Sequence, residues 1–563
     1  MKNTRYEHWL QHPNTLPELK EQLRTMSDQE IQDCFYTNLE FGTAGMRGLL
    51  GPGPNRMNMH TIRKANVAFA RYIVDAGKEA MQRGVAIAYD NRHFSKEFAF
   101  ESARVLAMHQ ITSYVFSSLR PTPELSFAVR HLQCFGGIVI TASHNPKEYN
   151  GYKLYDERGC QLVPELVGKV IDHIGKIEDE LELAVSLTAQ QEALIHVIDQ
   201  EVDLPYYEKV LGIQIHPELS KEDLHIIFTP QHGTARVAVE EVLQQAGYRY
   251  TLVKEQAEPD PDFSNTKTPN PEEQKAYELA IEYAQREEAD IVLTTDPDAD
   301  RVGVVVRHNG SYQLMSGNQT GSVLIQYVLS QLQETGKLPV NPVLFNTVVT
   351  SDLGEKVART FAVEVEKTLT GFKFIGEKIH QHEQKQDKNF VFGYEESYGY
   401  LIQPFVRDKD AVQACLIIAE AANYYKKQGK TLFDVLESLY DTFGWYEESQ
   451  VSLSLAGEEG ARRIAQIMSS LRADKPDAVA GTAVVKWEDY QTLTAWNKTT
   501  MSTLEFPSSD VLKLYLEDGS WIAARPSGTE PKCKFYYCVV GKTGADAKEK
   551  TLRYQQAMKQ IIE

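Results

Sequence analysis

Residues 136–150 have the sequence G-G-I-V-I-T-A-S-H-N-P-K-E-Y-N, and this stretch decides how the chain is interpreted. Its apolar beginning predicts a buried strand, and the Asn-Pro pair that follows excludes a helix. Ser143 and His144 therefore fall on a turn after a strand, and Lys153 follows ten residues beyond the serine. A hydroxyl on a sharp turn beside proton carriers is the arrangement that covalent group transfer requires. A surface turn with incidental polar residues is the alternative.

A second stretch carries three carboxylates at alternate positions. Residues 291–295, I-V-L-T-T, predict a buried strand that leads directly into Asp296, Asp298 and Asp300, which we call the aspartate trio. Three such carboxylates repel one another unless a cation lies among them, and oxygen-only ligands favour Mg²⁺ or Ca²⁺. An EF-hand is excluded because Arg301 stands where that loop needs glycine. A solvated turn or a helix-capping cluster is the alternative here.

Together these stretches resemble the α-D-phosphohexomutase superfamily, the phosphoglucomutase and phosphomannomutase group. Three further segments resemble that superfamily: residues 42–48, G-T-A-G-M-R-G, its N-terminal arginine turn; residues 393–399, G-Y-E-E-S-Y-G, its sugar-binding loop; and residues 525–532, R-P-S-G-T-E-P-K, its phosphate-binding loop. The segments occur in the expected order and extend over nearly the whole chain.

Composition limits the classes of partner. The chain has 563 residues, of which 59 are basic and 78 acidic, so its formal net charge is −19. Such a field repels phosphate backbones and anionic lipids, so we expect neither nucleic acid nor membrane partners. The six cysteines form no C-x-x-C pair, which argues against zinc and, more strongly, against a disulfide framework in so large a chain. No apolar run has the length of a membrane span, so we expect a cytoplasmic protein.

Short β-branched runs alternate with longer amphipathic stretches, as in α/β proteins. The resemblance implies a four-domain architecture around a central cleft, with three mixed α/β sandwich domains and a smaller C-terminal α+β domain. We place domain I with the phosphoserine loop at residues 1–204 and domain II with the metal-binding loop at 205–314. Domain III with the sugar-binding loop follows at 315–446, and domain IV with the phosphate-binding loop at 447–563.

The same alternation predicts individual elements. We expect strands at residues 85–89, 114–116, 137–141, 224–229, 343–349 and 390–392. We expect helices at residues 98–109, 272–286, 322–332, 411–427 and 545–562.

The resemblance also implies roles for residues around the first two stretches. Ser143 would carry a phosphoryl group, and one Mg²⁺ per chain would be held by the aspartate trio and by Ser143 through its phosphate. Lys153 is the preferred proton carrier, because the turn at Asn150-Gly151 folds the chain back toward the serine, and His144 is the alternative. Arg47 would stabilise the transferring phosphoryl group.

Residues that bind the substrate come from the other segments. Glu395 and Ser397 are suited to two neighbouring sugar hydroxyls, because a carboxylate accepts and a hydroxyl both donates and accepts. Arg301 would offset the remaining negative charge beside the substrate. The phosphate that is not reacting would be bound by Arg525, Ser527, Gly528 and Thr529, with Lys373 assisting from domain III.

We therefore expect an isomerase that interconverts α-D-glucose 1-phosphate and glucose 6-phosphate, with glucose 1,6-bisphosphate as intermediate and activator. Residues 368–373, T-L-T-G-F-K, resemble the phosphoglucomutase/phosphopentomutase branch, so phosphopentomutase activity stays open beside phosphomannomutase activity. A metal-dependent sugar-phosphate phosphatase and a non-catalytic sugar-phosphate-binding protein are alternatives of other classes. We expect small-molecule sugar phosphates as partners, and a monomer or weak homodimer.

Overall fold

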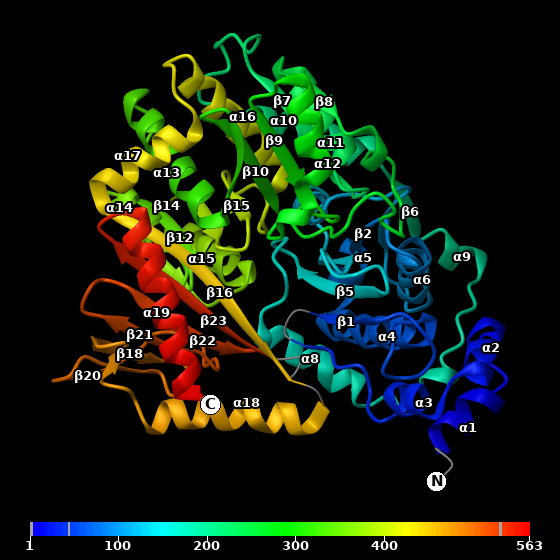
Figure 1. Ribbon diagram of the computed structural model, residues 1–563. Helices are drawn as coiled ribbons and strands as arrows, with labels where there is room; N and C mark the ends of the chain where they lie inside the picture. The colour runs from blue at the N-terminus through cyan, green and yellow to red at the C-terminus, as the bar shows by residue number, and fades with distance from the viewer. Residues whose placement is uncertain (1–3, 43–44, 456, 528–531, 563) are drawn as a thin grey trace. The chain divides into compact units, whose positions relative to one another are not determined.

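The computed structural model describes residues 4–42, 45–455, 457–527 and 532–562 (Figure 1). The chain forms two compact units. Unit 1 comprises Met1–Gly317 and Phe372–Thr431, and unit 2 comprises Asn318–Gly371 and Leu432–Glu563. The chain therefore leaves unit 1 and returns to it before it completes unit 2.

The first sheet of unit 1 is mixed. Its strands follow the order β1 (Met46–Leu49), β5 (Tyr149–Asp156), β4 (Gly136–Ile140), β2 (Val85–Tyr89), β3 (Ser113–Phe116) and β6 (Ile195–Ile198). The last four run parallel to one another, whereas β5 is antiparallel to both of its neighbours. The buried strands β2 and β4 are continuous apolar runs, as expected for strands covered on both faces.

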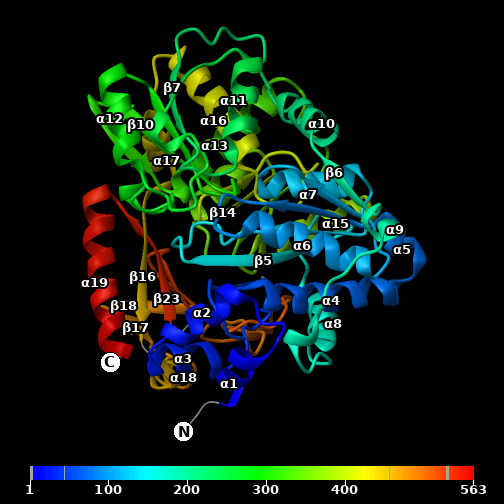
Figure 2. The ribbon, with the colours of Figure 1, turned by 90° about the vertical axis from the view of Figure 1, so that its right-hand side faces the viewer.

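Helices surround this sheet. They are α4 (Met59–Ala76), α5 (Lys78–Arg83), α6 (Ser95–Met108), α7 (Thr122–His131), α8 (Pro164–Ile174), α9 (Ala189–Glu192) and α10 (Gln200–Leu211). Helix α4 lies beside β5 in both views (Figures 1 and 2), and the buried hydroxyl of Tyr152 on β5 donates to Asn66 on α4 at 2.9 Å. One apolar cluster joins α4, α6 and α8 to the sheet.

Three short helices precede the first strand: α1 (Thr4–Gln11), α2 (Pro17–Thr25) and α3 (Asp28–Phe35). Their apolar faces form a separate small cluster around Trp9, Leu23 and Phe35, which also includes Leu181. Leu181 belongs to the short 3₁₀ turn η1 (Glu180–Glu182), so this turn is packed against the N-terminal helices.

The second sheet of unit 1 is also mixed. Its order is β11 (Ser311–Met315), β10 (Val302–His308), β9 (Ile291–Thr295), β7 (His225–Thr229) and β8 (Arg249–Leu252), with helices α11 (Ala235–Ala246) and α12 (Glu278–Glu287). We predicted one helix over residues 272–286. Residues 274–277 instead form a 3₁₀ turn before α12. The buried hydroxyl of Tyr277 donates a hydrogen bond to the carbonyl of Pro271 at 2.5 Å.

The returning segment of unit 1 contains α15 (Phe372–Lys385), the antiparallel hairpin of β14 (Asn389–Glu395) and β15 (Gly399–Leu401), and α16 (Ala411–Lys426). Helix α16 is buried along nearly its whole length and packs against α10, α11 and the second sheet. The prediction of a long helix at residues 411–427 is confirmed to within one residue.

Unit 2 contains α13 (Gly317–Glu334) except for its first residue, the parallel strands β12 (Pro342–Thr347) and β13 (Glu364–Thr368), α14 (Asp352–Thr360), which lies between these strands in the sequence, and α17 (Leu432–Phe443). An antiparallel sheet follows in the order β16 (Trp445–Ser454), β23 (Lys532–Gly541), β22 (Trp521–Pro526), β21 (Leu512–Leu516), β18 (Thr482–Asp489), β19 (Thr494–Trp496) and β20 (Met501–Thr503), with β17 (Ala478–Val479) beside β18. Helices α18 (Gly457–Ala473) and α19 (Gly544–Ile562) complete it.

These sheets confirm the predicted α/β class with a C-terminal α+β part. The four domain boundaries and the central cleft stay predictions. Among the described residues, no helix combines the length and the apolar character that crossing a lipid bilayer requires.

Helix α16 begins at a buried carboxylate. Asp410 is fully buried and caps the helix by accepting the N–H groups of Val412 at 2.9 Å and Gln413 at 3.0 Å, and the hydroxyl of Tyr206 also donates to it at 2.9 Å. Burial nevertheless raises the pKa of Asp410 from 3.8 to about 6. The folded protein therefore retains a proton between pH 4 and 6 that the unfolded chain has released.

Asp410→Asn should consequently change the pH dependence of stability. The wild type loses stability as pH rises from 4 to 6 and then carries a constant penalty, whereas an asparagine cap has no charge to bury. The difference in unfolding free energy should grow in favour of the variant by about 3 kcal/mol over this window and stay constant above it. Denaturant unfolding at several pH values measures it, with Asp441→Asn at an exposed position of α17 as the control. A difference independent of pH would contradict the assignment.

Candidate active site

Ser143 lies on the turn that joins β4 to the antiparallel strand β5. Its φ of 51° is in the left-handed region, which costs a residue with a Cβ roughly 1–2 kcal/mol. The side chain of Thr141 stabilises this turn by accepting the N–H of Ser143 at 2.8 Å. The serine hydroxyl is thereby aimed away from its own turn, and it donates to Asp296 Oδ2 at 2.7 Å.

A buried arginine holds the same turn from behind. The Arg92 side chain is fully buried, and Asp90 Oδ2 lies 3.3 Å from its Nε. The guanidinium donates to four backbone carbonyls of the turn, namely those of Ser143 (2.6 Å), Asn145, Pro146 (2.8 Å) and Tyr149 (3.0 Å). Because a planar guanidinium fixes several acceptors at once, Arg92 determines the shape of the serine turn.

The aspartate trio lies on the hairpin loop between β9 and β10, residues 296–301. Asp296 Oδ1 shapes this loop by accepting the N–H groups of Asp300 at 3.1 Å and Arg301 at 3.0 Å. All three carboxylates are buried, and one oxygen from each lies within 4.8 Å of the others. Burial and the charges of Asp298 and Asp300 raise the pKa of Asp296 well above its usual value.

The trio is suited to a hard divalent cation. Asp298 Oδ1 and Asp300 Oδ1 are buried and accept no hydrogen bond from the described residues, although buried carboxylate oxygens normally have partners. A set of oxygen donors with unused lone pairs facing one another fits Mg²⁺. The residues present therefore fit the metal that the sequence predicts.

Two lysines compensate part of the buried charge. Lys153 on β5 donates to Asp298 Oδ2 at 3.0 Å, and Lys409 lies 2.9 Å from Asp300 Oδ2 and 3.1 Å from Asp408 Oδ1. Burial lowers the pKa of Lys409, but Asp300, Asp408 and Glu395 outweigh it and raise that pKa above its usual value. Lys409 is therefore a permanent cation in this site.

The sugar-binding loop of the sequence analysis reaches the same place. Glu395 is buried at the end of β14 and Ser397 is half-buried just beyond it. Gly399 allows Lys409 to approach, because a Cβ at this glycine would lie 2.0 Å from the lysine Cδ. The loop is also tied to the aspartate hairpin, since the N–H of Val302 donates to the carbonyl of Tyr398 at 3.0 Å.

Other predicted residues surround the serine. Arg47 on β1 donates to the side chain of Asn145 at 3.0 Å, and Arg301 pairs with Glu272 at 2.6 Å. His144 Nδ1 lies 3.2 Å from Ser143 Oγ. Burial and the charges of Arg301 and Arg47 lower the pKa of His144 well below its usual value, so its imidazole is neutral at physiological pH.

The predicted phosphate-binding residues are only partly placed. Lys373 is buried in the first turn of α15, with Nζ 5.3 Å from the ring centroid of Phe374. Arg525 lies near the end of β22 in unit 2, and Ser527 directly follows that strand. Gly528 and Thr529 lie outside the described residues. The phosphate-binding loop therefore stays a prediction.

Comparison with known proteins shows the family to which this chain is related. Sequence models of phosphoglucomutase/phosphomannomutase α/β/α domains I, II and III match residues 38–181, 205–310 and 316–443. The chain is 40% identical over 531 residues to a phosphoglucomutase of Staphylococcus aureus strain MSSA476, and the match covers 93% of this chain and 94% of the relative.

Solved structures show the same fold. A putative phosphomannomutase from Thermus thermophilus superposes with a TM-score of 0.69 at 20% identity, over 93% of this chain and 99% of that one. The open form of parafusin, a phosphoglucomutase from Paramecium, gives a TM-score of 0.67 at 19% identity, over 93% and 95% of the two chains.

This chain belongs to the phosphoglucomutase/phosphomannomutase family. It is thus a phosphohexomutase-type isomerase, and the predicted superfamily and fold class are confirmed. The roles of individual residues are a separate matter and stay proposals.

The structure adds residues to this phosphohexomutase site that the sequence analysis missed. Thr122 at the start of α7 donates its N–H to the carbonyl of Asp298 at 2.8 Å and its hydroxyl to Asp298 Oδ2 at 2.9 Å. Lys409 belongs to the charged run R-D-K-D directly before the apolar helix α16. A run of charges beside a buried helix is a local pattern from which this residue could have been identified. Arg92 and Thr122 carry no comparable signal, because their partners lie 51 and 176 residues away.

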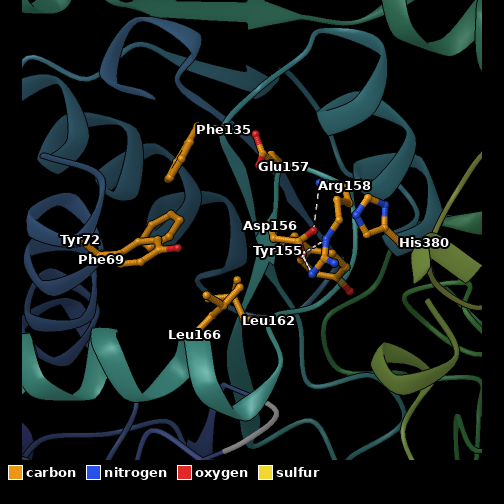
Figure 3. A pocket seen from close by; sticks show the side chains of 10 residues that line it. All are labelled: Phe69, Tyr72, Phe135, Tyr155, Asp156, Glu157, Arg158, Leu162, Leu166 and His380. Atoms are coloured by element: carbon orange, nitrogen blue, oxygen red, sulfur yellow. Dashed lines mark hydrogen bonds and ion pairs between the residues drawn. The ribbon is translucent and has the colours of Figure 1, made fainter. Parts of the chain in front are cut away.

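A cavity of about 260 Å³ lies within unit 1, beside the C-terminal end of β5. Figure 3 shows the rings of Phe69, Tyr72 and Phe135 on one side of it and the polar side chains of Asp156, Arg158 and His380 on the other. Tyr155 also lines it, and its hydroxyl donates to Asp408 Oδ2 at 2.7 Å. The cavity wall is thus connected to the pair of Asp408 and Lys409.

The serine turn should lose its fixed conformation when lysine replaces Arg92. Arg92→Lys keeps the charge but cannot donate to four carbonyls, so the hydroxyl of Ser143 should lose its fixed direction. We expect kcat to fall about a hundredfold with a smaller change in KM, because misplacement of a reacting group affects the chemical step. Arg83→Lys is a matched control, since Arg83 also donates to backbone carbonyls, those of Gln133 and Cys134. Equal kcat in both variants would contradict this role for Arg92.

Proposed function

We propose that this isomerase interconverts α-D-glucose 1-phosphate and glucose 6-phosphate through a phosphoserine at Ser143, with glucose 1,6-bisphosphate as intermediate and activator. The observation that carries the proposal is the serine hydroxyl, 2.7 Å from a carboxylate of the buried trio, whose other members have oxygens without hydrogen-bond donors among the described residues. The Staphylococcus relatives that are about 40% identical over most of the chain are named phosphoglucomutases, which favours glucose over mannose or pentose.

The reaction exchanges one phosphoryl group at a time. In the first half, the bond between Ser143 Oγ and phosphorus breaks, a bond from phosphorus to a sugar oxygen forms, the proton of that sugar hydroxyl passes to a base, and Ser143 Oγ takes up a proton. The bisphosphate then turns round. In the second half, the bond between phosphorus and the sugar oxygen at the other end breaks, a bond from phosphorus to Ser143 Oγ forms, the serine proton passes to a base, and the released sugar oxygen takes up a proton.

Bound Mg²⁺, one per chain, would be held by the aspartate trio and Ser143, and it would supply positive charge that stabilises the transferring group. The residues of the chain supply the remaining charge. Lys153 and Lys409 each contact one carboxylate of the trio, and Arg301 Nε lies 3.6 Å from Asp300 Oδ1. Arg47, which donates to the serine turn, would contact the equatorial phosphoryl oxygens.

Two groups are candidates for proton transfer. Lys153 is the proposed carrier, because it is buried beside Asp298 and stands on the strand that follows the serine turn. His144 is the second candidate, because its neutral imidazole lies 3.2 Å from Ser143 Oγ and can accept a proton there. Lys153→Met should therefore slow both half-reactions, whereas His144→Gln keeps a hydrogen-bonding side chain beside the serine.

Substrate binding is assigned by the same reasoning. Glu395 and Ser397 grip neighbouring sugar hydroxyls, and the fixed charges of Arg301 and Lys409 surround Glu395. By the family resemblance alone, the phosphate that is not reacting is assigned to Lys373, Arg525, Ser527, Gly528 and Thr529. The proposed partners are small-molecule sugar phosphates, and we propose a cytoplasmic monomer or weak homodimer.

The covalent step is tested directly by mass. Incubation of the wild type with glucose 1,6-bisphosphate and Mg²⁺ should add one phosphoryl group, and peptide mapping should place it on Ser143. Ser143→Ala should acquire none and should lose at least about 10³-fold of kcat, because the nucleophile is absent. Ser117→Ala, in a turn of the same domain, is the control. Undiminished turnover by Ser143→Ala would rule out the phosphoserine mechanism.

Substrate choice is tested with three sugar 1-phosphates. Purified enzyme should have a higher kcat/KM for glucose 1-phosphate than for mannose or ribose 1-phosphate, and activity should require Mg²⁺ and be restored by it after chelation. A preference for ribose 1-phosphate would assign a phosphopentomutase instead. Release of inorganic phosphate faster than isomerisation would favour a phosphatase.

A further inference from the structure

Two histidines and two carboxylates meet at the N-terminal helices, outside the segments that form the proposed active site. His8 lies on α1, and His12 follows one turn later, directly after its last residue. Asp179 and Glu182 face them from the 3₁₀ turn η1 and the residue before it. We call these four residues the histidine cluster.

The cluster has the spacing of a metal site. His8 Nε2 lies 2.7 Å from Asp179 Oδ2, and His12 Nε2 lies 2.9 Å from Glu182 Oε1. The ligand atoms of His8, His12 and Asp179 all lie within 4.8 Å of one another. Tetrahedral bonds of about 2.0–2.1 Å place neighbouring ligand atoms about 3.3 Å apart, so His8 Nε2 and Asp179 Oδ2 have to separate by only about half an ångström. Glu182 is not one of the three grouped ligands and contacts His12 alone.

The ligands are already held in place. Asp179 caps η1 by accepting the N–H of Leu181 with Oδ1 at 2.9 Å, which leaves Oδ2 directed at His8. The turn itself is fixed to α4 by the ion pair of Glu180 and Lys64 at 3.0 Å. Buried Trp9 packs in one apolar cluster with Leu181 and so fixes α1 against η1. Such support of the ligands from behind is typical of metal sites.

The charge and the donor types select the ion. Two carboxylates carry two negative charges and neutral imidazoles carry none, so a divalent cation makes the set neutral. Imidazole nitrogen is a ligand for zinc and other transition metals, whereas Mg²⁺ prefers oxygen alone. Two histidines four residues apart on one helical turn are an established way to bind zinc.

We propose that His8, His12 and Asp179, with Glu182 as the carboxylate partner of His12, form a structural site for Zn²⁺ or a related divalent transition metal, which links the N-terminal helices to the turn η1. The family model for domain I matches residues 38–181. The metal site would therefore join α1, which precedes this match, to the turn η1 at its end. Cysteine spacing gave no sign of such a site, because its ligands are histidines and carboxylates separated by about 170 residues.

Binding is tested on the full-length enzyme with excess Mg²⁺, which occupies the oxygen site of the aspartate trio. Calorimetric titration with Zn²⁺ should show one additional site per chain, and Co²⁺ should give visible absorption typical of nitrogen ligation. His8→Ala and His12→Ala should each weaken this binding about tenfold or more. His196→Ala, at an exposed position of β6, should leave it unchanged.

Stability provides a second readout that does not depend on activity. Zn²⁺ should raise the melting temperature of the wild type and of His196→Ala, because a ligand that binds the folded state stabilises it. Zn²⁺ should leave the melting temperature of His8→Ala unchanged. This variant should fold, because half of the His8 side chain is exposed. If Zn²⁺ bound equally to the wild type and to both cluster variants, or only at a site that Mg²⁺ blocks, the cluster would be a pair of ion pairs and the proposal would be wrong.

Discussion

The structure depends on burying three carboxylates at the end of one strand. Removing a carboxylate from water costs several kcal/mol unless opposite charge and hydrogen bonds replace the lost hydration. The hairpin between β9 and β10 supplies two backbone N–H groups to Asp296, and the Thr122 hydroxyl donates to Asp298. Lysines from two other segments then approach Asp298 and Asp300. The incomplete compensation is what gives the trio its capacity for a cation.

This requirement explains why several segments converge on one hairpin. Lys153 comes from the strand after the serine turn, and Lys409 comes from the charged run before α16. Each reaches a different carboxylate, so the loss of either would remove the nearest cation from a buried charge. Gly399 contributes by having no side chain, since a Cβ there would displace Lys409. The site is thus an electrostatic balance that only the assembled unit 1 provides.

The serine is controlled by shape as much as by charge. A left-handed φ at a residue with a Cβ persists only where the surroundings impose it. Arg92 imposes it by donating hydrogen bonds to the carbonyls of the turn, and Thr141 imposes it by accepting the N–H of Ser143. The same principle of a local motif held by distant partners applies to the histidine cluster, where an ion pair to α4 fixes the turn that presents Asp179.

Apolar runs and turn residues are local signals, so the strands that end at Ser143 and at the aspartate trio could be predicted from the amino-acid order. It also determined the family, through five ordered segments that include Arg47 and Glu395. The folded chain was needed to place Arg92 and Thr122 in the site, to pair Lys409 with Asp300, and to bring His8 against Asp179. These contacts join residues far apart in the chain, and no local pattern of hydrophobicity or turn chemistry encodes which distant charge will neutralise a buried one.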